Sequence, residues 1–384
     1  MADLALPAIN RAHLEALTSD LGIWQHATGP VPNRAFGYCT DDVARALTVD
    51  VLHARELGWS AVHASAWRSL RFLRDAFDPV TGRFRNFRDA HGAWIDGAAS
   101  EDSHGRALRA LGATIAAGAD REFGANARVL FAAALPAAAH LHALRATASS
   151  ILGCTAALGS SSLDDDLRAG TGAVLRLTAD RLRGRFGGVA GDRDWPWPEP
   201  VLTYENALLP HALIEAGRRL SDGAMRRSGL AALDWLSGHQ GGDGVFSPIG
   251  NDGWELRDGP RARFDQQPIE ATTTILAAEA AFAATADTRH IATAERAFAW
   301  FLGTNDVGVP VAEPGRGACH DGLGPDGVNA NQGAESTLMW LTGLEHLRHL
   351  RARATASRDS AKVAPHLPPY ALEHVAATMR PREG

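Results

Sequence analysis

The fold is decided by the stretch Ser100-Glu101-Asp102-Ser-His104-Gly-Arg106-Ala-Leu108, where a polar loop enters a helix rich in alanine and leucine. Comparable junctions recur along the chain and carry an acidic residue at Asp42, Glu205, Glu270 and Glu335. With Asp102 included, successive acidic residues are 60, 103, 65 and 65 positions apart, so that the long step is close to two short ones. A sixth copy would therefore fall near Cys154, in an apolar run. A fixed period of this kind is typical of a repeat architecture.

Other helical segments alternate with these junctions. Segments with apolar residues at i, i+3, i+4 and i+7 lie at residues 66–73, 127–141, 229–236 and 294–302, a spacing that indicates one buried face. The helices that follow the junctions, such as residues 272–282, are apolar most of the way round, which indicates burial on most sides. Six pairs of an outer and an inner helix predict an all-α, (α/α)6 toroid. Its polar loops would lie at one end, around a central pocket.

The loops before the inner helices are long and rich in glycine, proline and tryptophan, and loops of this length inside a domain are usually functional. Residues 82–94 and 244–254 each predict a short β-hairpin with a glycine turn. The repeat predicts a single toroid domain at residues 1–351. Residues 352–384 lose the period and predict a loosely ordered tail with at most one short helix.

Composition excludes several classes of function. The net charge is −6 and no basic stretch is combined with aromatic residues, so nucleic acid is not an expected partner. No apolar stretch reaches the length of a membrane span. The only lysine is Lys362, which excludes a lysine Schiff base and a Walker-type phosphate site in the body of the chain, and no cofactor is expected. The first residues lack a signal-peptide pattern and the three cysteines form an odd set, so a cytoplasmic location is expected.

Carboxylates dominate the junctions and suggest acid–base chemistry. Cleavage of a glycosidic bond needs two carboxyl groups, one that protonates the leaving oxygen and one that activates water or attacks carbon. Carboxylates that converge on the ring axis would raise one another's pKa, which keeps a general acid protonated near neutral pH. The catalytic candidates are Asp102, Glu205, Asp265 and Glu335. The alternative is that these residues are helix caps, because carboxylates favour helix N-termini.

Aromatic and amide side chains near the junctions predict a sugar-binding surface. Sugar rings stack on aromatic faces, and pockets combine such walls with a few polar groups. Glu101 and His104 are three positions apart and Asp102 and Arg106 are four apart, so each pair can meet on one helix face. The alternatives are that the tryptophans seal the ends of the barrel, that the amides form caps and turns, and that His104 is structural. The candidate binding residues are Tyr38, Asp42, Arg45, Glu101, His104, Arg106, Trp195, Trp197, Tyr204, Asn206, Trp254, Gln266, Gln267, Glu270, Asn331 and Gln332.

A metal site is not expected. Cys319-His320 with Cys39 and Cys154 would offer zinc ligands and has a faint similarity to the lanthionine cyclases. The three thiols lie in unrelated contexts, however, and Cys154 lies in an apolar run.

Several motifs together resemble a bacterial family in the six-hairpin glycosidase-like superfamily, whose members are often labelled glycosyltransferase-like. They are Thr40-Asp41-Asp42-Val-Ala-Arg45, residues 100–108, Trp195-Pro-Trp197 with residues 202–207, residues 248–254, Phe264-Asp265-Gln266-Gln267-Pro-Ile-Glu270 and residues 331–338. The resemblance covers residues 30–350 and implies an (α/α)6 toroid that acts on or binds carbohydrate. The family usually has an aspartate where this chain has Glu205, and the extra methylene would move a catalytic carboxyl by about an ångström.

The expected function is cleavage of a glycosidic bond in an oligosaccharide or glycoside, with inversion. Asp102 or Glu205 would be the acid and Glu335 or Asp265 the base. A phosphorylase is a second possibility, with Arg45 and Arg106 available for phosphate. A noncatalytic sugar-binding partner of a glycosyltransferase is a third. A sugar epimerase or isomerase is a fourth, and it would need two facing histidines from among His104, His211 and His320.

Overall fold

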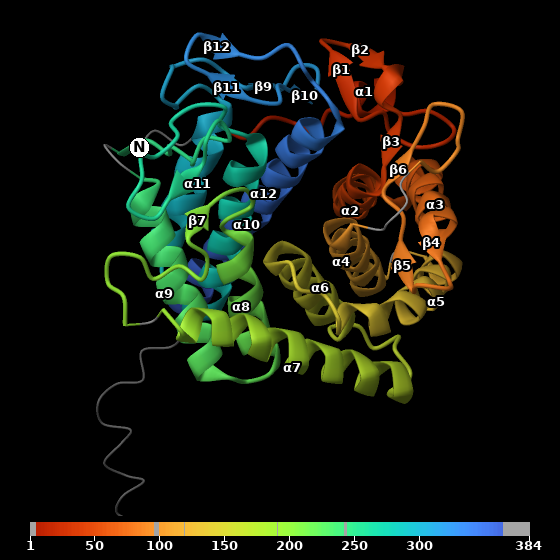
Figure 1. Cartoon of the computed structure of the whole chain (residues 1–384), viewed down its shortest axis with the longest axis horizontal. Helices are drawn as coiled ribbons and strands as arrows, with labels where there is room; N and C mark the ends of the chain where they lie inside the picture. Colours follow the sequence, from red (N-terminus) through yellow and green to blue (C-terminus); the bar gives the residue numbers. More distant parts are fainter. Residues whose placement is uncertain (1–4, 96–99, 119, 190, 242–243, 364–384) are drawn as a thin grey trace, which may run out of the picture.

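The predicted inner helices form a closed ring (Figure 1). The computed structural model describes residues 5–95, 100–118, 120–189, 191–241 and 244–363. Each inner helix contacts the next one along the chain, and the last contacts the first. The six are α2 (Thr40–Leu57), α4 (Glu101–Ala117), α6 (Leu144–Ala157), α8 (Leu208–Arg219), α10 (Pro268–Thr285) and α12 (Ala334–Val363). The predicted (α/α)6 toroid is thus confirmed, including the helix around Cys154.

The composition of the inner helices explains why they can lie inside the ring. Helix α10 is buried over nearly its whole surface, as its continuous apolar sequence predicts. Pro268 occupies its first turn, where a missing N–H leaves no hydrogen bond unmade. Glycines let α4 and α6 approach closely: a Cβ on Gly112 would lie 2.1 Å from the carbonyl oxygen of Gly153.

Five long outer helices cover the ring. They pack against successive inner helices through one apolar face each, as the amphipathic spacing predicts. The sixth outer position is different, because the short α1 (Ala12–Ala16) contacts α12 there. The five are α3 (Trp59–Ala76), α5 (Arg121–Ala138), α7 (Asp165–Gly187), α9 (Gly223–His239) and α11 (Arg289–Phe301).

Short strands in the loops form six two-stranded antiparallel sheets within the described ranges. Of the two predicted hairpins, the one at residues 82–94 is confirmed in part, because Arg88 bridges Trp94 across the turn at Gly92, and the one at residues 244–254 is wrong. Gly82 turns between β4 and β5, but β6 pairs with β3, and β8 pairs with β7 instead of with residues 244–254. The strands are β1 (His26–Thr28), β2 (Val31–Asn33), β3 (Tyr38–Cys39), β4 (Phe77–Asp78), β5 (Arg83–Phe84), β6 (Phe87–Arg88), β7 (Val201–Leu202), β8 (Glu255–Leu256), β9 (Ala312–Glu313), β10 (Ala318–Cys319), β11 (Leu323–Gly324) and β12 (Gly327–Val328).

Helix α12 continues well past the predicted end of the domain, to Val363. The first part of the predicted tail is therefore helical, while residues 364–384 lie outside the described residues. Within the described ranges, no helix combines the length and the apolar character that crossing a membrane would require.

Candidate active site

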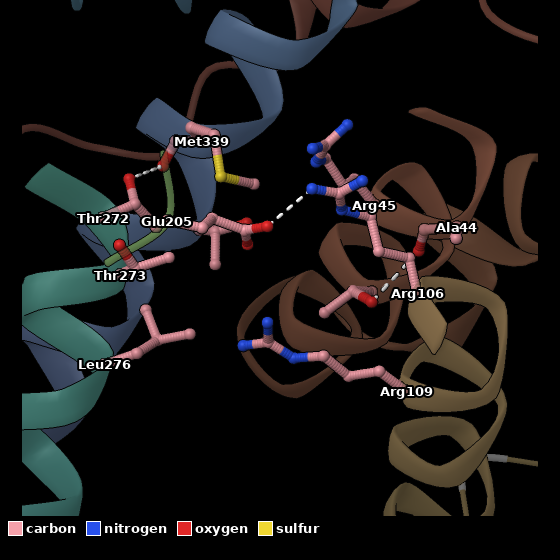
Figure 2. A pocket seen from close by; sticks show the side chains of 11 residues that line it. Ala44, Arg45, Arg106, Arg109, Glu205, Thr272, Thr273, Leu276 and Met339 are labelled. Carbon is pink, nitrogen blue, oxygen red and sulfur yellow. Dashed lines mark hydrogen bonds and ion pairs between the residues drawn. The ribbon is translucent and has the colours of Figure 1, made fainter. Parts of the chain in front are cut away.

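A small cavity of ≈40 Å³ lies on the ring axis between α2 and α4 on one side and α10 and α12 on the other (Figure 2). Arg45 and Arg106 lie at the end of this cavity nearest the N-termini of the inner helices. Glu205 enters it from the loop before α8. The charged groups around the axis therefore come from helices that are far apart in sequence.

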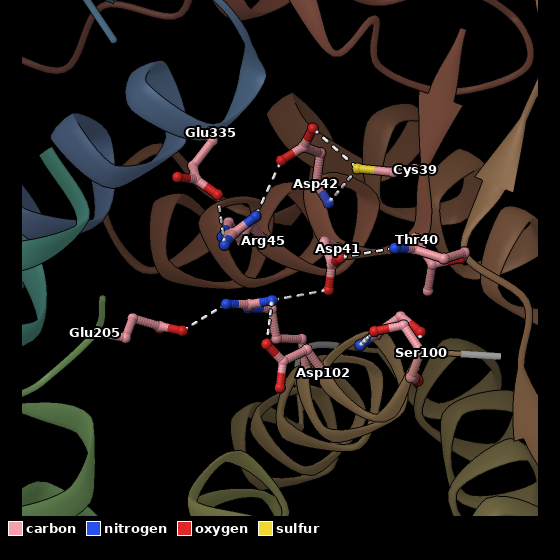
Figure 3. Close-up of polar contacts among 12 residues, drawn as sticks. Cys39, Thr40, Asp41, Asp42, Arg45, Ser100, Asp102, Glu205 and Glu335 are labelled. Atoms are coloured by element: carbon pink, nitrogen blue, oxygen red, sulfur yellow. Dashed lines mark hydrogen bonds and ion pairs between the residues drawn. The ribbon is translucent and has the colours of Figure 1, made fainter. Parts of the chain in front are cut away.

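Arg45 forms ion pairs with two carboxylates at the end of the ring where the inner helices begin. Its guanidinium lies 3.0 Å from Asp42 Oδ1 and 2.8 Å from Glu335 Oε2 (Figure 3). Asp42 is buried, and its pKa is raised to about 6 by burial in spite of Arg45, with Glu335 adding to the rise. Glu335 is the more accessible partner, with 37% of its side chain exposed.

Arg106, one turn into α4, binds carboxylates from three elements. Its guanidinium lies 3.1 Å from Asp41 Oδ1, 2.5 Å from Glu205 Oε2 and 3.7 Å from Asp102 Oδ2. The contact with Asp102 is the i, i+4 pair that the sequence predicts. Tyr204 donates its hydroxyl to Asp102 Oδ2 at 2.6 Å. The two arginines and these five carboxylates form one layer across the axis, which we call the ionic layer: Arg45, Arg106, Asp41, Asp42, Asp102, Glu205 and Glu335.

Glu205 is ionised in this layer. Burial by itself would raise its pKa, but Arg106, Arg45 and Arg109 together hold the pKa below its ordinary value. The residue also has a φ of 48°, in the left-handed region that non-glycine residues rarely adopt and that is common at functional sites. An ionised carboxyl in an ion pair cannot donate a proton near neutral pH. The interpretation of Glu205 as the general acid therefore loses its physical basis.

A second group of acids lies above the ionic layer, around Asp321. Burial raises the pKa of Asp321 to about 7, with further increases from the nearby charges of Glu335, Asp42 and Asp265. A hydrogen bond with Asn331 acts in the opposite direction, and none of the largest effects on this pKa comes from an arginine. A substantial fraction of Asp321 is therefore protonated near neutral pH.

Backbone pairing brings Asp265 to this group. Gln266 and Leu323 exchange both backbone hydrogen bonds, at 3.1 and 2.9 Å, which places Asp265 beside Gly322. A Cβ on Gly322 would lie 2.6 Å from Asp265 Oδ1, so a larger residue there would displace the Asp265 side chain. Asn251 donates to the other oxygen of Asp265 at 3.3 Å. Like Glu205, Asp265 has a left-handed φ, of 56°.

The open side of this group carries aromatic and polar side chains. Trp254 is 41% exposed and donates its indole N–H to Asn251. Phe36 is exposed and packs against His26 at a ring distance of 4.4 Å. Asn331, beside His26, bonds to it at 2.9 Å. These groups could contact a hydroxylated ligand.

Glu270 lies in the core next to the ionic layer. Burial raises its pKa to about 7, although Asn206 donates two hydrogen bonds to it through its backbone and side-chain nitrogens. Asn206 is itself fully buried and bonded to Arg145 and Thr203. Both residues hold the loop of Glu205 in place, and neither is accessible to a ligand.

Several predicted binding residues lie in the core and are corrected to structural roles. Tyr38 is buried, stacks on Trp24 at 4.2 Å and bonds to Ser19. Trp195 and Trp197 are buried against Trp235 on α9. Trp197 also contacts Phe186 of α7 and so packs between two outer helices, which is a structural role but a different one from sealing the ends of the barrel.

Other predicted residues are committed to local contacts. Glu101 accepts the backbone N–H groups of His142 and Ala143, each at 2.7 Å, and so caps α6. His104 is buried against Phe84, and burial lowers its pKa to about 4.

The buried amides anchor the loops. Gln266 accepts from Trp300 and donates to Asp306, and Gln332 donates to Glu313. Gln267 is half-buried at the start of α10 and stays a binding candidate.

The sequence missed Asp321, Asp41, His26 and Asn251. Asp41 could have been found, since it precedes Asp42 in a quoted motif. Asp321 lies in the Cys319–Gly322 turn that suggested zinc. The three cysteines are buried and form no disulfide. Within the described ranges, potential metal ligands gather at Glu56, Glu345 and His349, whose ligand atoms lie within 4.8 Å of one another near the opposite end of the ring.

No family model matches the sequence, and no curated protein matches it either. Solved structures do match over most of the chain. Cellobiose 2-epimerase from Bacillus thermoamylovorans covers 89% of this chain and 98% of its own, at 12% identity and a TM-score of 0.67. D-Mannose isomerase covers 88% and 96%, at 9% identity and a TM-score of 0.68. The GH76 α-mannanase from Bacteroides thetaiotaomicron covers 90% and 95%, at 10% identity and a TM-score of 0.59. At these identities the shared property is the (α/α)6 toroid fold, and this chain has that fold.

Proposed function

We propose that this protein is a carbohydrate-active enzyme that cleaves a glycosidic bond with inversion, at the end of the ring where the inner helices begin. The observation that carries the proposal is Asp321, a carboxyl with a pKa of about 7 among the carboxylates Glu335, Asp42 and Asp265. Glycoside hydrolysis needs this combination of one protonated and one ionised carboxyl group. The similar structures named above include enzymes whose names refer to sugars, which supports a carbohydrate substrate.

Asp321 is the proposed general acid. It donates its proton to the glycosidic oxygen as the bond to the anomeric carbon breaks. A group with a pKa near the working pH is an effective acid, because it is protonated in a useful fraction of molecules and still gives up the proton readily. Asp102 and Glu205 are less suited, since Arg106 contacts both.

Glu335 and Asp265 are the proposed candidates for the base. Each can take a proton from the water that attacks the opposite face of the anomeric carbon. Glu335 is oriented by Arg45, and Asp265 by Asn251 and by its place against Gly322. Glu335 has the larger exposed surface, with 37% of its side chain open.

Substrate binding is assigned to the open side of the same group. Trp254 and Phe36 offer exposed aromatic faces for a sugar ring, and Tyr204 a half-buried one. Asn331 and Gln267 can exchange hydrogen bonds with hydroxyls.

The charges favour hydrolysis over phosphorolysis. A phosphorylase would need cations free to bind phosphate near the scissile bond. Arg45 is paired with Asp42 and Glu335, and Arg106 with Asp41 and Glu205. Neither guanidinium of the ionic layer is therefore free for phosphate.

The noncatalytic alternative predicts carboxylates that serve only as caps. Glu101 fits that description, because its oxygen accepts two backbone N–H groups. Glu335 and Asp265 instead contact side chains, which supports the catalytic proposal.

A sugar epimerase is the second candidate, and His26 is the observation that favours it. Burial lowers the pKa of His26, so it is neutral at pH 7 and able to take a proton, while Glu335 acts in the opposite direction. The histidines expected for this chemistry do not converge. His104 packs on Phe84, His211 lines a cavity at the other end of the ring, and His320 is bonded to Glu313.

The test is NMR of products from manno-, gluco- and galacto-oligosaccharides, with and without phosphate. New reducing ends of inverted configuration support the proposal. Phosphate-dependent release of a sugar 1-phosphate would show a phosphorylase, and a changed sugar with its linkage intact would show an epimerase. Intact substrates whose signals broaden on addition of protein would show a binding module.

Asp321→Asn then tests the acid. It should abolish cleavage of natural oligosaccharides but keep much of the activity on aryl glycosides, whose leaving group needs little protonation. Asp326→Asn, an exposed change in the turn between β11 and β12, is the matched control. Equal loss on both substrate types would contradict the role of Asp321 as acid.

A further inference from the structure

A second, larger cavity of ≈310 Å³ lies on the ring axis at the opposite end, where the inner helices finish. All six inner helices contribute to its lining. Its volume falls at the lower end of the range of roughly 300–1,000 Å³ that is typical of small-molecule sites. It lies on the far side of the ionic layer from Asp321, and it shares four lining residues with the small axial cavity: Thr48, Arg109, Leu276 and Thr342.

Positive charge dominates the lining of this cavity. Arg55, Arg109 and Arg219 all line it, and in the described part of the chain none of them has a carboxylate within ion-pair distance. The carboxylate in the lining, Glu215, is instead held by Arg218 through both oxygens, at 2.8 and 2.9 Å. The cavity therefore has excess positive charge.

Arg109 is the least expected of the three arginines. Arg55 and Arg219 are exposed in the last turns of α2 and α8, where a cation also favours the helix dipole. Arg109 lies in the middle of α4, where the dipole gives no such benefit. Burial lowers the pKa of its guanidinium, although Glu205 acts in the opposite direction. Arg109 is half-buried and has no ion-pair partner among the described residues, so a bound anion would stabilise its charge.

The other residues that line the cavity can bind the hydroxylated part of a small ligand. The hydroxyls of Thr48 and Thr155 donate to the backbone of their own helices and can still accept hydrogen bonds from a ligand. The Nδ1 atom of His211 is buried without a hydrogen-bond partner in the described residues. Apolar side chains, such as those of Val51 and Leu152, cover the remaining wall.

We propose that this cavity binds a phosphate monoester of a small hydroxylated molecule, such as a sugar phosphate. Arg109 would bind the phosphoryl group from within, and Arg55 and Arg219 would attract it at the mouth. Guanidinium groups form paired, charge-assisted hydrogen bonds with phosphate oxygens, which makes arginine suited to this ligand. The proposal does not depend on the reaction at the other end of the ring.

Titration calorimetry tests it with three ligands at constant ionic strength: inorganic phosphate, glucose 6-phosphate and glucose. We expect glucose 6-phosphate to bind more tightly than inorganic phosphate, and glucose to give no heat that depends on Arg109. Arg109→Met should weaken binding of the phosphate ester at least about tenfold. Arg176→Met, an exposed change on the outer helix α7, is the matched control and should leave the affinity unchanged.

Two further variants keep the result decisive if Arg109→Met does not fold. Arg55→Met and Arg219→Met alter exposed side chains and should each weaken binding. Asp321→Asn, on the other side of the ionic layer, should not. The proposal is overturned if neither phosphate compound binds, or if all three arginine variants bind like the wild type. Equal affinity for inorganic phosphate and the ester would overturn the assignment of the ester.

Discussion

Replacing Asp321 with asparagine should make the folded protein more stable, and by a larger margin as the pH rises. The pKa of Asp321 is raised from 3.8 to about 7 by burial and by neighbouring carboxylates. The folded protein therefore binds a proton at this site more tightly than the unfolded chain does. Because the folded state holds more protons between about pH 4 and 7, the free energy of unfolding falls as the pH rises through this window. Asparagine does not titrate, so the variant does not lose free energy of unfolding at this site as the pH rises.

The size of the effect follows from the shift. A difference of about three pKa units corresponds to about 4 kcal/mol, since each unit is worth 1.36 kcal/mol. This is an upper limit, because solvent reaches part of the Asp321 side chain and screens its charge. We expect wild type and Asp321→Asn to be about equally stable at pH 4. Above pH 7 the variant should be more stable by as much as about 4 kcal/mol.

Urea denaturation at half-unit steps from pH 4 to pH 9 measures this difference. Asp326→Asn, an exposed change in the neighbouring turn, should show the pH dependence of the wild type. Other buried acids, such as Glu270, titrate in both proteins and largely cancel in the comparison. A difference in stability that stays constant from pH 4 to pH 9 would refute the raised pKa, and with it the reason for assigning Asp321 as the acid.

Three further outcomes follow from the structure. Arg106→Met leaves Glu205 and its neighbours as buried charges without a partner, so we expect a loss of about 3–5 kcal/mol in the free energy of unfolding, measured by urea denaturation. Gly112→Ala places a Cβ 2.1 Å from a carbonyl oxygen of α6 and should lower the free energy of unfolding, measured by thermal denaturation, by about 1–3 kcal/mol or more. The control Gly172→Ala, which has open space around it on α7, should be neutral or stabilising. Trp254→Ala removes an exposed aromatic face and should raise KM up to about tenfold with little change in kcat, measured by steady-state kinetics on the substrate that the NMR panel identifies.

The ring could be predicted from sequence because acidic residues and helical segments recur along the chain at nearly regular intervals. Five of the six inner helices begin near an acidic residue of the repeat, and the sixth, around Cys154, was predicted from the spacing alone. The pair Asp102 and Arg106 was also predictable, since it depends only on the pitch of one helix. Helical periodicity depends on residues that are close together in the chain, so it can be predicted from the sequence without knowledge of long-range contacts.

The site was harder because it depends on pairings between distant loops. Asp321 meets Asp265 through the backbone pairing of Gln266 with Leu323, and no feature of either segment points to the other. The β7–β8 pairing was missed for the same reason. Trp197 shows the opposite error: a tryptophan in a polar loop suggests a ligand wall, but α9 supplies an apolar partner for it.

The two arginines explain how one end of a ring can hold both acids and bases. Glu205 lies just before α8, and the nearby guanidiniums, first of all that of Arg106, hold its pKa below the ordinary value, so it remains ionised among like charges. Asp321 comes from a loop between short strands, and burial together with the charges of nearby carboxylates raises its pKa. Burial and neighbouring charges, and not the element that carries a carboxyl, decide its protonation state, because Asp42 and Glu270 begin inner helices and the pKa of each is raised. Among the three carboxyls with a raised pKa, Glu270 is fully buried and Asp42 is paired with Arg45, whereas Asp321 is only half-buried, which is why Asp321 is the best candidate for the proton donor.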